Sequence, residues 1–443
     1  MVTGPEAKAA APGAPLRVGI AGLGTVGGGV IKVLDANAAL IARRAGRPIV
    51  VTAVSARDRS RDRGVDLTRF QWVDDATALA GRDDVDVVVE LVGGADGPAL
   101  TLARAALAAR KPFVTANKAM LAHHGLLLAE LAEISGTPLK FEAAVAGGIP
   151  VIKGLREGTA ANALSRIYGI LNGTCNYILT RMEKEGLEFA AVLADAQRLG
   201  FAEADPSFDI DGVDAAHKLS ILASMAFGSR PDFANVETTG IRDVGLADIR
   251  QAAALGFKIR LIGLAELVGD TLLQRVRPSL VPMSHPLAAV DGPLNAVVAE
   301  GNFVGRLLFM GRGAGEGPTA SAVVADLIDI ARGEAGPAFA MPALALAGFA
   351  PAGPASRAGR YCLRIRVADR QGVLADLTAA LRDAGVSIES LIQQASGADG
   401  TALVVMITHE TTESAVQQAL AEMAALPAAT GAPLFMPILP QDG

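Results

Sequence analysis

Short apolar runs alternate with stretches of helical periodicity along the first third of the chain. Apolar runs occupy 16–21, 48–56, 84–94 and 111–118, and helical patterns lie between them, among them 74–80 and 97–110. Strands that alternate with helices predict a parallel sheet with right-handed crossovers. We therefore expect a Rossmann-type α/β domain, with a further strand at 138–150 that runs into a turn.

The remaining two thirds follow other patterns. A strand is predicted at 165–173, followed by helices at 174–186 and 189–200 and a helix that starts near Asp211. The stretch 333–359 is rich in Pro, Ala and Gly, a composition typical of a linker. Beyond it the chain predicts a strand at 361–369, a helix at 372–385, strands at 386–396 and 401–410, a helix at 412–426 and a last strand at 434–439. That order is a ferredoxin-like βαββα(β) module.

Composition limits the class of protein. A chain of 443 residues is too long for one ordinary core, so two or three domains are expected. The net charge of −6 gives no general affinity for nucleic acid or for an anionic membrane. Cys175 and Cys362 are far apart, so neither a disulfide framework nor a zinc site follows. With no secretory signal or membrane-length apolar stretch, the sequence predicts a cytoplasmic protein.

The glycines Gly22, Gly24 and Gly27 form a GxGxxG pattern between the first strand and the helix after it. In a dinucleotide-binding turn the first glycine permits a tight bend, the second lets the backbone approach a pyrophosphate, and the third lets helix and strand pack closely. The helix N-terminus supplies N–H groups to the phosphates. The alternative is a glycine-rich turn that binds nothing, but the strand and helix around the pattern favour a dinucleotide.

The residues that follow the second strand help to distinguish a site for NADP from a site for NAD. The strand runs into Ser55–Arg63, where Arg57 is the first of four arginines. Arginine at this place suits the 2′-phosphate of NADP. Asp58 keeps NAD compatible with the sequence, and a solvated loop of mixed charge explains any single arginine equally well.

The stretch 200–218 concentrates five carboxylates ahead of Lys218. Asp214 and Lys218 are four residues apart in a predicted helix, so both side chains lie on one face. A surface ion pair is one explanation. Apolar neighbours such as Val213 and Leu219 indicate burial instead, where a lysine held by a carboxylate could pass a proton to a carbonyl oxygen. The spacing alone leaves both open.

Long motifs in a fixed order resemble the homoserine dehydrogenase family, in the form that carries a C-terminal ACT domain. They are VGIAGLGTVGGGV, DVVVELVGG, VTANKAMLAHHG, FEAAVAGGIPVI, GILNGTCNYILTRM, GFAEADPSFDIDGVDAAHK and GRGAGEGPTASAVVADL. The resemblance implies NAD(P)H-dependent reduction of L-aspartate 4-semialdehyde to L-homoserine, in the route to threonine, methionine and isoleucine. Another amino-acid dehydrogenase, such as an aspartate dehydrogenase, and a non-catalytic amino-acid sensor remain as alternatives.

The resemblance also implies domain limits. They are a flexible tail at 1–15, an NAD(P)-binding domain at 16–150, an α+β catalytic and dimerisation domain at 151–318, a helix at 319–336 that returns to the nucleotide domain, a linker at 337–359 and an ACT domain at 360–435. The ACT domain is expected to bind L-threonine, or else to serve only in dimerisation. Its pairing predicts a homo-oligomer, either a dimer or a tetramer.

By the same resemblance, Lys218 donates the proton and Asp214 orients it. The implied substrate-binding residues are Glu203, Thr174, Asp205 and Lys118. The implied cofactor-binding residues are Gly22, Gly24, Thr25, Val26, Gly27, Arg57, Thr115, Lys118, Gly313 and Gly315. A monovalent cation, usually sodium, is implied at the carboxylate or carbonyl of Glu142 and the carbonyls of Val145, Gly147 and Ile149, although a plain strand-to-turn link explains that turn without a cation.

Two acidic residues and several departures from the family pattern lead to further expectations. Asp209 and Asp211 are expected to cap the helix that follows them. The chain departs from the family pattern at Phe201, where tyrosine is frequent, and at Arg312 and Gln371, where proline is frequent.

Overall fold

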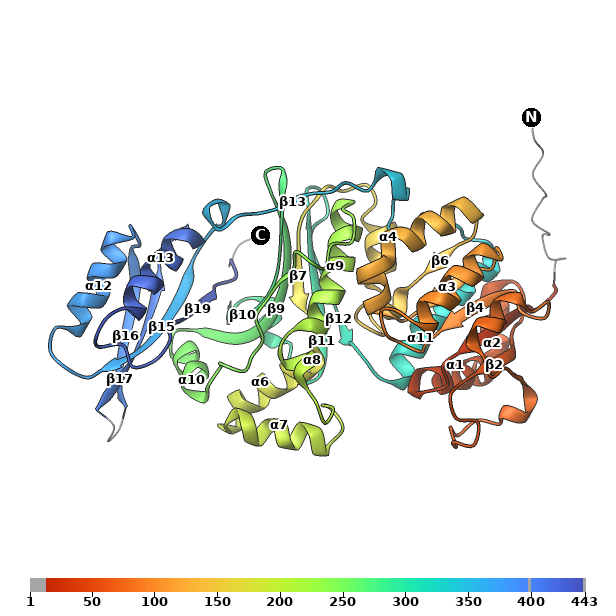
Figure 1. Ribbon diagram of the computed structural model, residues 1–443, viewed down its shortest axis with the longest axis horizontal. Coiled ribbons are helices and arrows are strands. Elements are labelled where there is room, and N and C mark those ends of the chain that lie inside the picture. Colours follow the sequence, from red (N-terminus) through yellow and green to blue (C-terminus); the bar gives the residue numbers. More distant parts are fainter. Residues whose placement is uncertain (1–12, 397–399, 441–443) are drawn as a thin grey trace. The chain divides into compact units, whose positions relative to one another are not determined.

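The computed structural model describes residues 13–396 and 400–440, so most of the predicted N-terminal tail lies outside the described residues. The chain forms two compact units (Figure 1). The first contains the residues up to Ala161, Ser220–Phe233 and Gly311–Ala347, and the second contains Asn162–Leu219, Ala234–Met310 and the chain from Gly348 onward.

The first unit is built on a six-stranded parallel sheet in the order β3-β2-β1-β4-β5-β6. The strands are β1 (Leu16–Ala21), β2 (Ile49–Ser55), β3 (Gln71–Trp72), β4 (Val87–Glu90), β5 (Phe113–Thr115) and β6 (Leu139–Lys140). This is the Rossmann strand order, so the predicted fold class is confirmed. The helices are α1 (Thr25–Ala36), α2 (Ala38–Ala45), α3 (Pro98–Ala108), α4 (Lys118–Ser135) and α11 (Glu316–Arg332).

The return of α11 to this unit is explained by its apolar face. Val323 and Leu327 are fully buried in one core with Val30 and Ile31 of α1. At Gly29 a β-carbon would lie 3.2 Å from the Ala320 β-carbon and closer still to Glu316. Glycine at this position therefore lets the two helices approach closely.

Two predicted elements of this unit differ from the structure. The helix expected at 74–80 is a 3₁₀ helix, η2 (Ala76–Gly81). The strand expected at 138–150 is only β6, followed by the 3₁₀ helix η3 (Glu142–Ala144). The Glu142 N–H donates to Asp326 of α11 over 2.8 Å instead of to a neighbouring strand, so the ladder ends there.

The second unit contains a sheet in the order β12-β11-β7-β9-β10-β13, with β8 also paired to β10. Its strands are β7 (Leu164–Ile170), β8 (Glu237–Thr238), β9 (Phe257–Val268), β10 (Thr271–Pro282), β11 (Leu294–Gly301), β12 (Gly305–Arg312) and β13 (Ala350–Pro351). The β9–β10 hairpin was not predicted. Its two-residue turn, Gly269-Asp270, is the signal that could have located it.

This sheet is accompanied by the helices α6 (Gly173–Glu185), α7 (Phe189–Arg198), α8 (Ser207–Ile210), α9 (Val213–Phe227) and α10 (Leu246–Ala254). The acidic stretch 200–218 lies in α8, the start of α9 and the loops before them. The division between the units falls within α9, between Leu219 and Ser220. Among the described residues no single helix has the length and apolarity to cross a membrane, although α1 and α2 meet that test as a pair bent by 84°.

The C-terminal module has the predicted ferredoxin-like order. Its sheet runs β16-β17-β15-β19, and its elements are β15 (Tyr361–Ala368), α12 (Val373–Asp383), β16 (Ile388–Ser396), β17 (Thr401–Thr408), α13 (Glu413–Ala424) and β19 (Leu434–Pro437). Buried apolar residues of the strands and of both helices form one core.

The module is joined to β10 by buried charges. Glu413, at the start of α13, is fully buried and lies within 3.5 Å of the guanidinium groups of Arg275, Arg277 and Arg357. Arg357 also pairs with Glu237 of β8 over 2.5 Å. The stretch predicted as a linker is accordingly packed: β13 pairs with β10, and the Arg357 side chain is buried.

Candidate active site

The Asp214–Lys218 pair lies in the first two turns of α9 and is buried. Asp214 is 5% exposed and Lys218 is 8% exposed. The Lys218 ammonium donates to Asp214 Oδ2 over 2.7 Å and to the Leu171 carbonyl over 2.8 Å. Burial therefore favours the interpretation as a held lysine over that of a surface ion pair. Among the described residues these two acceptors use two of the three ammonium hydrogens, which leaves one for a substrate oxygen.

The turn between β7 and α6 supplies the other partners of this pair. Asn172 is buried, and its side-chain oxygen accepts from the Cys175 N–H over 2.8 Å, which caps α6. Its amide nitrogen donates to Asp214 Oδ2 over 2.8 Å and to Asp209 Oδ1 over 2.7 Å. Asn295 donates to the same Leu171 carbonyl that accepts from Lys218. The motif analysis did not identify Asn172 or Asn295 as site residues.

Asp209 belongs to this group, so the expectation that it caps the next helix was wrong. Its carboxylate accepts from Asn172 and from the Thr174 hydroxyl, at 2.7 and 3.2 Å. Burial, reinforced by the nearby charge of Asp214, raises the pKa of Asp209 above its ordinary value. The capping expectation for Asp211 was also wrong, because its carboxylate pairs with Arg242.

The structure places the two expected substrate ligands of the loop before α8 at the surface. Glu203 and Asp205 are both exposed. Asp205 accepts from the Ser207 N–H over 3.1 Å, and its hydrogen bonds to Ser207 lower its pKa. Phe201, which stands where tyrosine is frequent in the family, stacks on Tyr177 with ring centroids 4.6 Å apart. Its carbonyl is a second acceptor for the Thr174 hydroxyl.

The glycine loop has the geometry that each predicted glycine role requires. Gly22 has a φ of +96°, and a β-carbon there would lie 2.5 Å from the Leu91 carbonyl oxygen. A β-carbon on Gly27 would lie 2.1 Å from the Gly22 carbonyl oxygen. Around Gly24 the space within 4 Å is open, and α1 begins at the next residue, Thr25. The loop therefore leaves an open approach to a helix N-terminus.

A cavity of about 520 Å³ lies beside this loop and is lined by Gly22, Gly24, Arg57, Asp58 and Arg61. Arg63 also lines it, but its guanidinium donates to the carbonyls of Leu23, Asp58 and Arg61. It therefore connects the loop after β2, residues 56–63, to the glycine loop between β1 and α1. Arg57 and Arg61 are the lining arginines without such a structural role among the described contacts.

The carboxyl ends of β4 and β5 are organised by a carboxylate that the sequence analysis did not single out. Glu90 is fully buried, and it accepts from the N–H groups of Val92 and Gly93 and from the Thr115 hydroxyl. The Thr115 side chain is therefore engaged within the fold. Asn117 caps α4 by accepting from the Met120 N–H, and Lys118 is the first residue of that helix.

The candidate cation turn has tight backbone geometry. Ala146 and Gly147 have φ of +58° and +53°, and a β-carbon on Gly147 would lie 2.4 Å from the Gly313 carbonyl oxygen. The Glu142 carboxylate accepts from the N–H groups of Ile152 and Lys153, one on each oxygen. Burial, together with the nearby Asp326, raises the pKa of Glu142 to about 7. Among described residues no cluster of three or more His, Cys, Asp or Glu could hold a metal.

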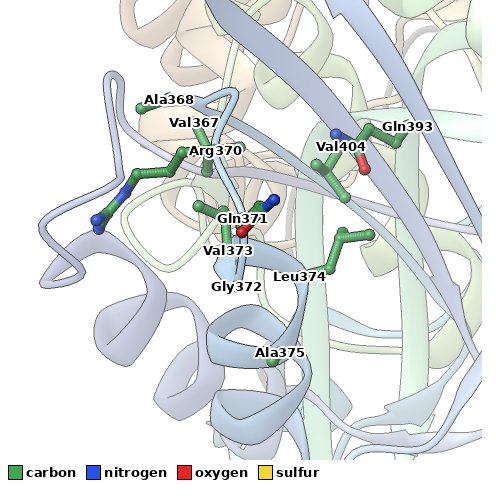
Figure 2. Close-up of a pocket in the computed structure, with 10 residues that line it drawn as sticks. All are labelled: Val367, Ala368, Arg370, Gln371, Gly372, Val373, Leu374, Ala375, Gln393 and Val404. Carbon is green, nitrogen blue, oxygen red and sulfur yellow. The ribbon is translucent and has the colours of Figure 1, made fainter.

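The C-terminal module has a cavity of about 360 Å³ at the start of α12 (Figure 2). Val367, Val373, Leu374 and Val404 give it apolar walls. Gln371 and Gln393 contribute amide groups, and Figure 2 shows the Arg370 side chain pointing away from them. A small ligand with both apolar and polar parts suits this lining.

Models of known protein families match three segments of the chain. Residues 22–142 match the homoserine dehydrogenase NAD-binding domain, 150–328 match homoserine dehydrogenase, and 363–428 match the ACT domain. The homoserine dehydrogenase of Neisseria gonorrhoeae is 45% identical over 421 residues, which are 93% of this chain and 96% of that protein. The chain belongs to the homoserine dehydrogenase family. It is accordingly an NAD(P)-dependent oxidoreductase.

Solved structures of the homoserine dehydrogenase family share this architecture. The enzyme from Thiobacillus denitrificans has a TM-score of 0.90 and 41% identity, covering 96% of this chain and 98% of that one. A hyperthermophilic archaeal homoserine dehydrogenase in complex with NADPH has a TM-score of 0.61 and 26% identity, covering 71% of this chain and 97% of its own. The family therefore includes a shorter member whose match leaves more than a quarter of this chain uncovered.

Proposed function

We propose that this chain catalyses the reversible reduction of L-aspartate 4-semialdehyde to L-homoserine, on the route to threonine, methionine and isoleucine. The observation that carries the proposal is the buried Lys218 ammonium, held by Asp214 and Leu171 with one hydrogen left. A nicotinamide dinucleotide, when bound, would supply or accept the hydride. Lys218 donates its proton to the aldehyde oxygen during reduction and takes up the hydroxyl proton during oxidation.

Asp214 has the role of orienting Lys218. A carboxylate 2.7 Å from the ammonium fixes its direction and stabilises its charged form in a buried place. Thr174 and Asp205 are proposed to bind the substrate, and Lys118 is proposed to bind both the substrate and the cofactor.

The direct test is the rate of L-homoserine oxidation with NADP and with NAD. We expect turnover with homoserine and none with L-aspartate. Turnover with L-aspartate and none with homoserine would favour an aspartate dehydrogenase-like enzyme.

NADP is the proposed cofactor. The cavity beside the glycine loop carries Arg57 and Arg61, whose charge suits a 2′-phosphate, and the archaeal relative is described with NADPH. The binding residues would be Gly22, Gly24, Thr25, Val26, Gly27 and the Thr115 backbone, with Gly313 and Gly315 on the loop before α11. Asp58 lines the same cavity and would allow NAD to bind.

Arg57→Ala is expected to raise KM for NADP about tenfold and to change KM for NAD less than about twofold, because one charge-assisted contact to the 2′-phosphate is lost. Steady-state kinetics with both cofactors measure this. Arg59→Ala is the matched control, since Arg59 stacks over Trp72, 5.6 Å from the ring centre, and does not line the cavity. Equal changes in KM for NADP and for NAD would show that Arg57 does not bind the 2′-phosphate.

Glu203 is proposed to bind the substrate ammonium. Glu203→Gln should raise KM for homoserine about tenfold while lowering kcat much less, because a carboxylate that meets the ammonium contributes equally in ground and transition states. Glu188→Gln, at another exposed carboxylate of the same region, serves as control. A loss confined to kcat would instead place Glu203 in the chemical step.

A sodium ion is proposed at the turn after η3. Its ligands would be the carboxylate or carbonyl of Glu142 and the carbonyls of Val145, Gly147 and Ile149, because oxygen ligands suit a hard cation. The left-handed backbone at Ala146 and Gly147 shapes this turn, and strained backbone of this kind clusters at ligand sites.

The C-terminal module is proposed to bind L-threonine and regulate the enzyme, within a homo-oligomer. The cavity at the start of α12 is large enough for an amino acid. The N-terminus of α12 favours a carboxylate, and the apolar walls suit a small side chain.

Threonine at millimolar concentration is expected to change the rate of homoserine oxidation, and Leu374→Arg should abolish that response. Leu374 lines the cavity and is partly exposed, so an arginine would place a charge at its mouth at little cost in stability. Leu344→Arg, at a 91% exposed leucine outside the module, is the control. A wild-type enzyme indifferent to threonine would leave the module as a dimerisation device.

A further inference from the structure

Asn172 has all of its side-chain hydrogen-bonding groups engaged within the group around Lys218. The orientation of its amide follows from its partners: the Cys175 N–H can only donate, so it faces the oxygen, and two carboxylate oxygens face the nitrogen. The side chain is 3% exposed. Asn172 therefore contacts the start of α6, the carboxylate of Asp209 and the carboxylate of Asp214, which is the ion-pair partner of Lys218.

The amide of Asn172 places a hydrogen-bond donor between two carboxylates. Asp209 and Asp214 approach the same nitrogen to 2.7 and 2.8 Å, so their oxygens lie close together. Lys218 contacts Asp214 and not Asp209. Two carboxylates that share a site repel each other unless donors lie between them. If the donor is removed, Asp214 is expected to turn away or to share a proton with Asp209, and either change alters how it holds Lys218.

We infer that Asn172 is a positioning residue of the reaction: the two hydrogens of its amide fix the carboxylates of Asp214 and Asp209 in place, and Asp214 so aims Lys218 at the substrate. The inference rests on the proposed function, in which Lys218 transfers the proton. Asn172 itself touches neither substrate nor cofactor in this assignment. Its effect passes through Asp214 to the ammonium.

A purely structural role is the competing explanation, because Asn172 also caps α6. Serine and aspartate cap helices about as well as asparagine, whereas alanine does not. Asn172→Ser therefore keeps the acceptor for Cys175 and leaves at most one hydrogen to donate, so the two carboxylates can no longer both be bound. Asn172→Asp keeps the acceptor, removes both donated hydrogens and adds a third negative charge. Asn172→Ala removes both functions.

The first experiment measures homoserine oxidation by these three variants. Asn172→Ser and Asn172→Asp are expected to lower kcat about ten- to a hundredfold, because a small misplacement of a catalytic group has effects of that size. KM for NADP should stay within about twofold, and Asn172→Ser should melt near the wild-type temperature. If Asn172→Ser keeps wild-type kcat, the residue is only a cap and the inference is overturned.

The second experiment combines Asn172→Ser with Lys218→Ala. If Asn172 acts through the lysine, its substitution should lower the residual rate of the Lys218→Ala enzyme less than about twofold. An equal loss in both backgrounds would overturn the inference.

A third measurement does not need activity. Thermal unfolding of Asn172→Ser, Asp214→Asn and the double variant should show non-additive changes, because the two side chains are in contact. Additive changes would overturn the contact on which the inference depends. A wild-type chain that does not oxidise homoserine would overturn the proposed function, and this unfolding cycle would still decide the contact.

Discussion

Replacing Lys218 by alanine is expected to lower kcat for homoserine oxidation about a hundredfold or more, with KM for NADP within about twofold of wild type. In the proposed mechanism the ammonium acts on the substrate oxygen, and its two acceptors, Asp214 and Leu171, hold it for that role. Removal therefore takes away the proton donor and leaves the glycine loop unchanged. Steady-state kinetics at saturating NADP measure the effect.

Lys184→Ala is the matched control for this prediction. Lys184 lies in the same unit and also pairs with a carboxylate, Asp291 at 2.8 Å, but its side chain is 57% exposed. Its replacement should leave kcat unchanged. A Lys218→Ala enzyme that keeps wild-type turnover would remove the lysine from the chemical step, whatever its burial.

Replacing Glu413 by glutamine is expected to destabilise the second unit by about 3 kcal/mol or more, because three arginines would keep their charges in a buried place without their shared carboxylate. Glu413 is fully buried, and the side chains of Arg275, Arg277 and Arg357 are at most 14% exposed. Desolvation already lowers the pKa of Arg277. Thermal or denaturant unfolding measures the change.

Glu410→Gln is the control, because Glu410 lies only three residues away and is exposed. Its effect on stability should stay within about 0.5 kcal/mol. If Glu413→Gln unfolds like the wild type, the arginines are solvated or paired elsewhere, and the buried network does not hold the module to β10.

Local sequence patterns were sufficient to predict the structural features that are determined by residues close together in the chain. The strands of the nucleotide-binding unit, the glycine loop and the Asp214–Lys218 spacing are all expressed within a few residues of the chain. Apolar neighbours such as Val213 and Leu219 indicated that the pair is buried, although the spacing alone left a surface ion pair open. The ferredoxin-like order of the C-terminal module was predicted for the same reason, since its strands and helices alternate in short segments, whereas its assignment as an ACT domain came from the family resemblance.

Contacts across long stretches of chain could not be predicted in this way. Asp209 and a helix-capping aspartate are chemically identical, and only the fold shows that Asn172, 37 residues earlier, donates to it. Glu413 and its partner Arg275 are 138 residues apart. The β9–β10 hairpin was missed for another reason: its turn signal is local, but no motif drew attention to it.

The buried charges that join the C-terminal module to β10 limit how such a module can be exchanged between relatives. A recombination junction near Gly348 would pass on Arg357 and Glu413 with the module and leave Glu237, Arg275 and Arg277 behind. A foreign module lacking a carboxylate at the start of its second helix would bury those arginines without a counter-charge. Functional chimaeras should therefore be those in which both parents carry the same arginines and carboxylates at these positions. Chimaeras in which β8 and β10 are transferred together with the module should also be functional.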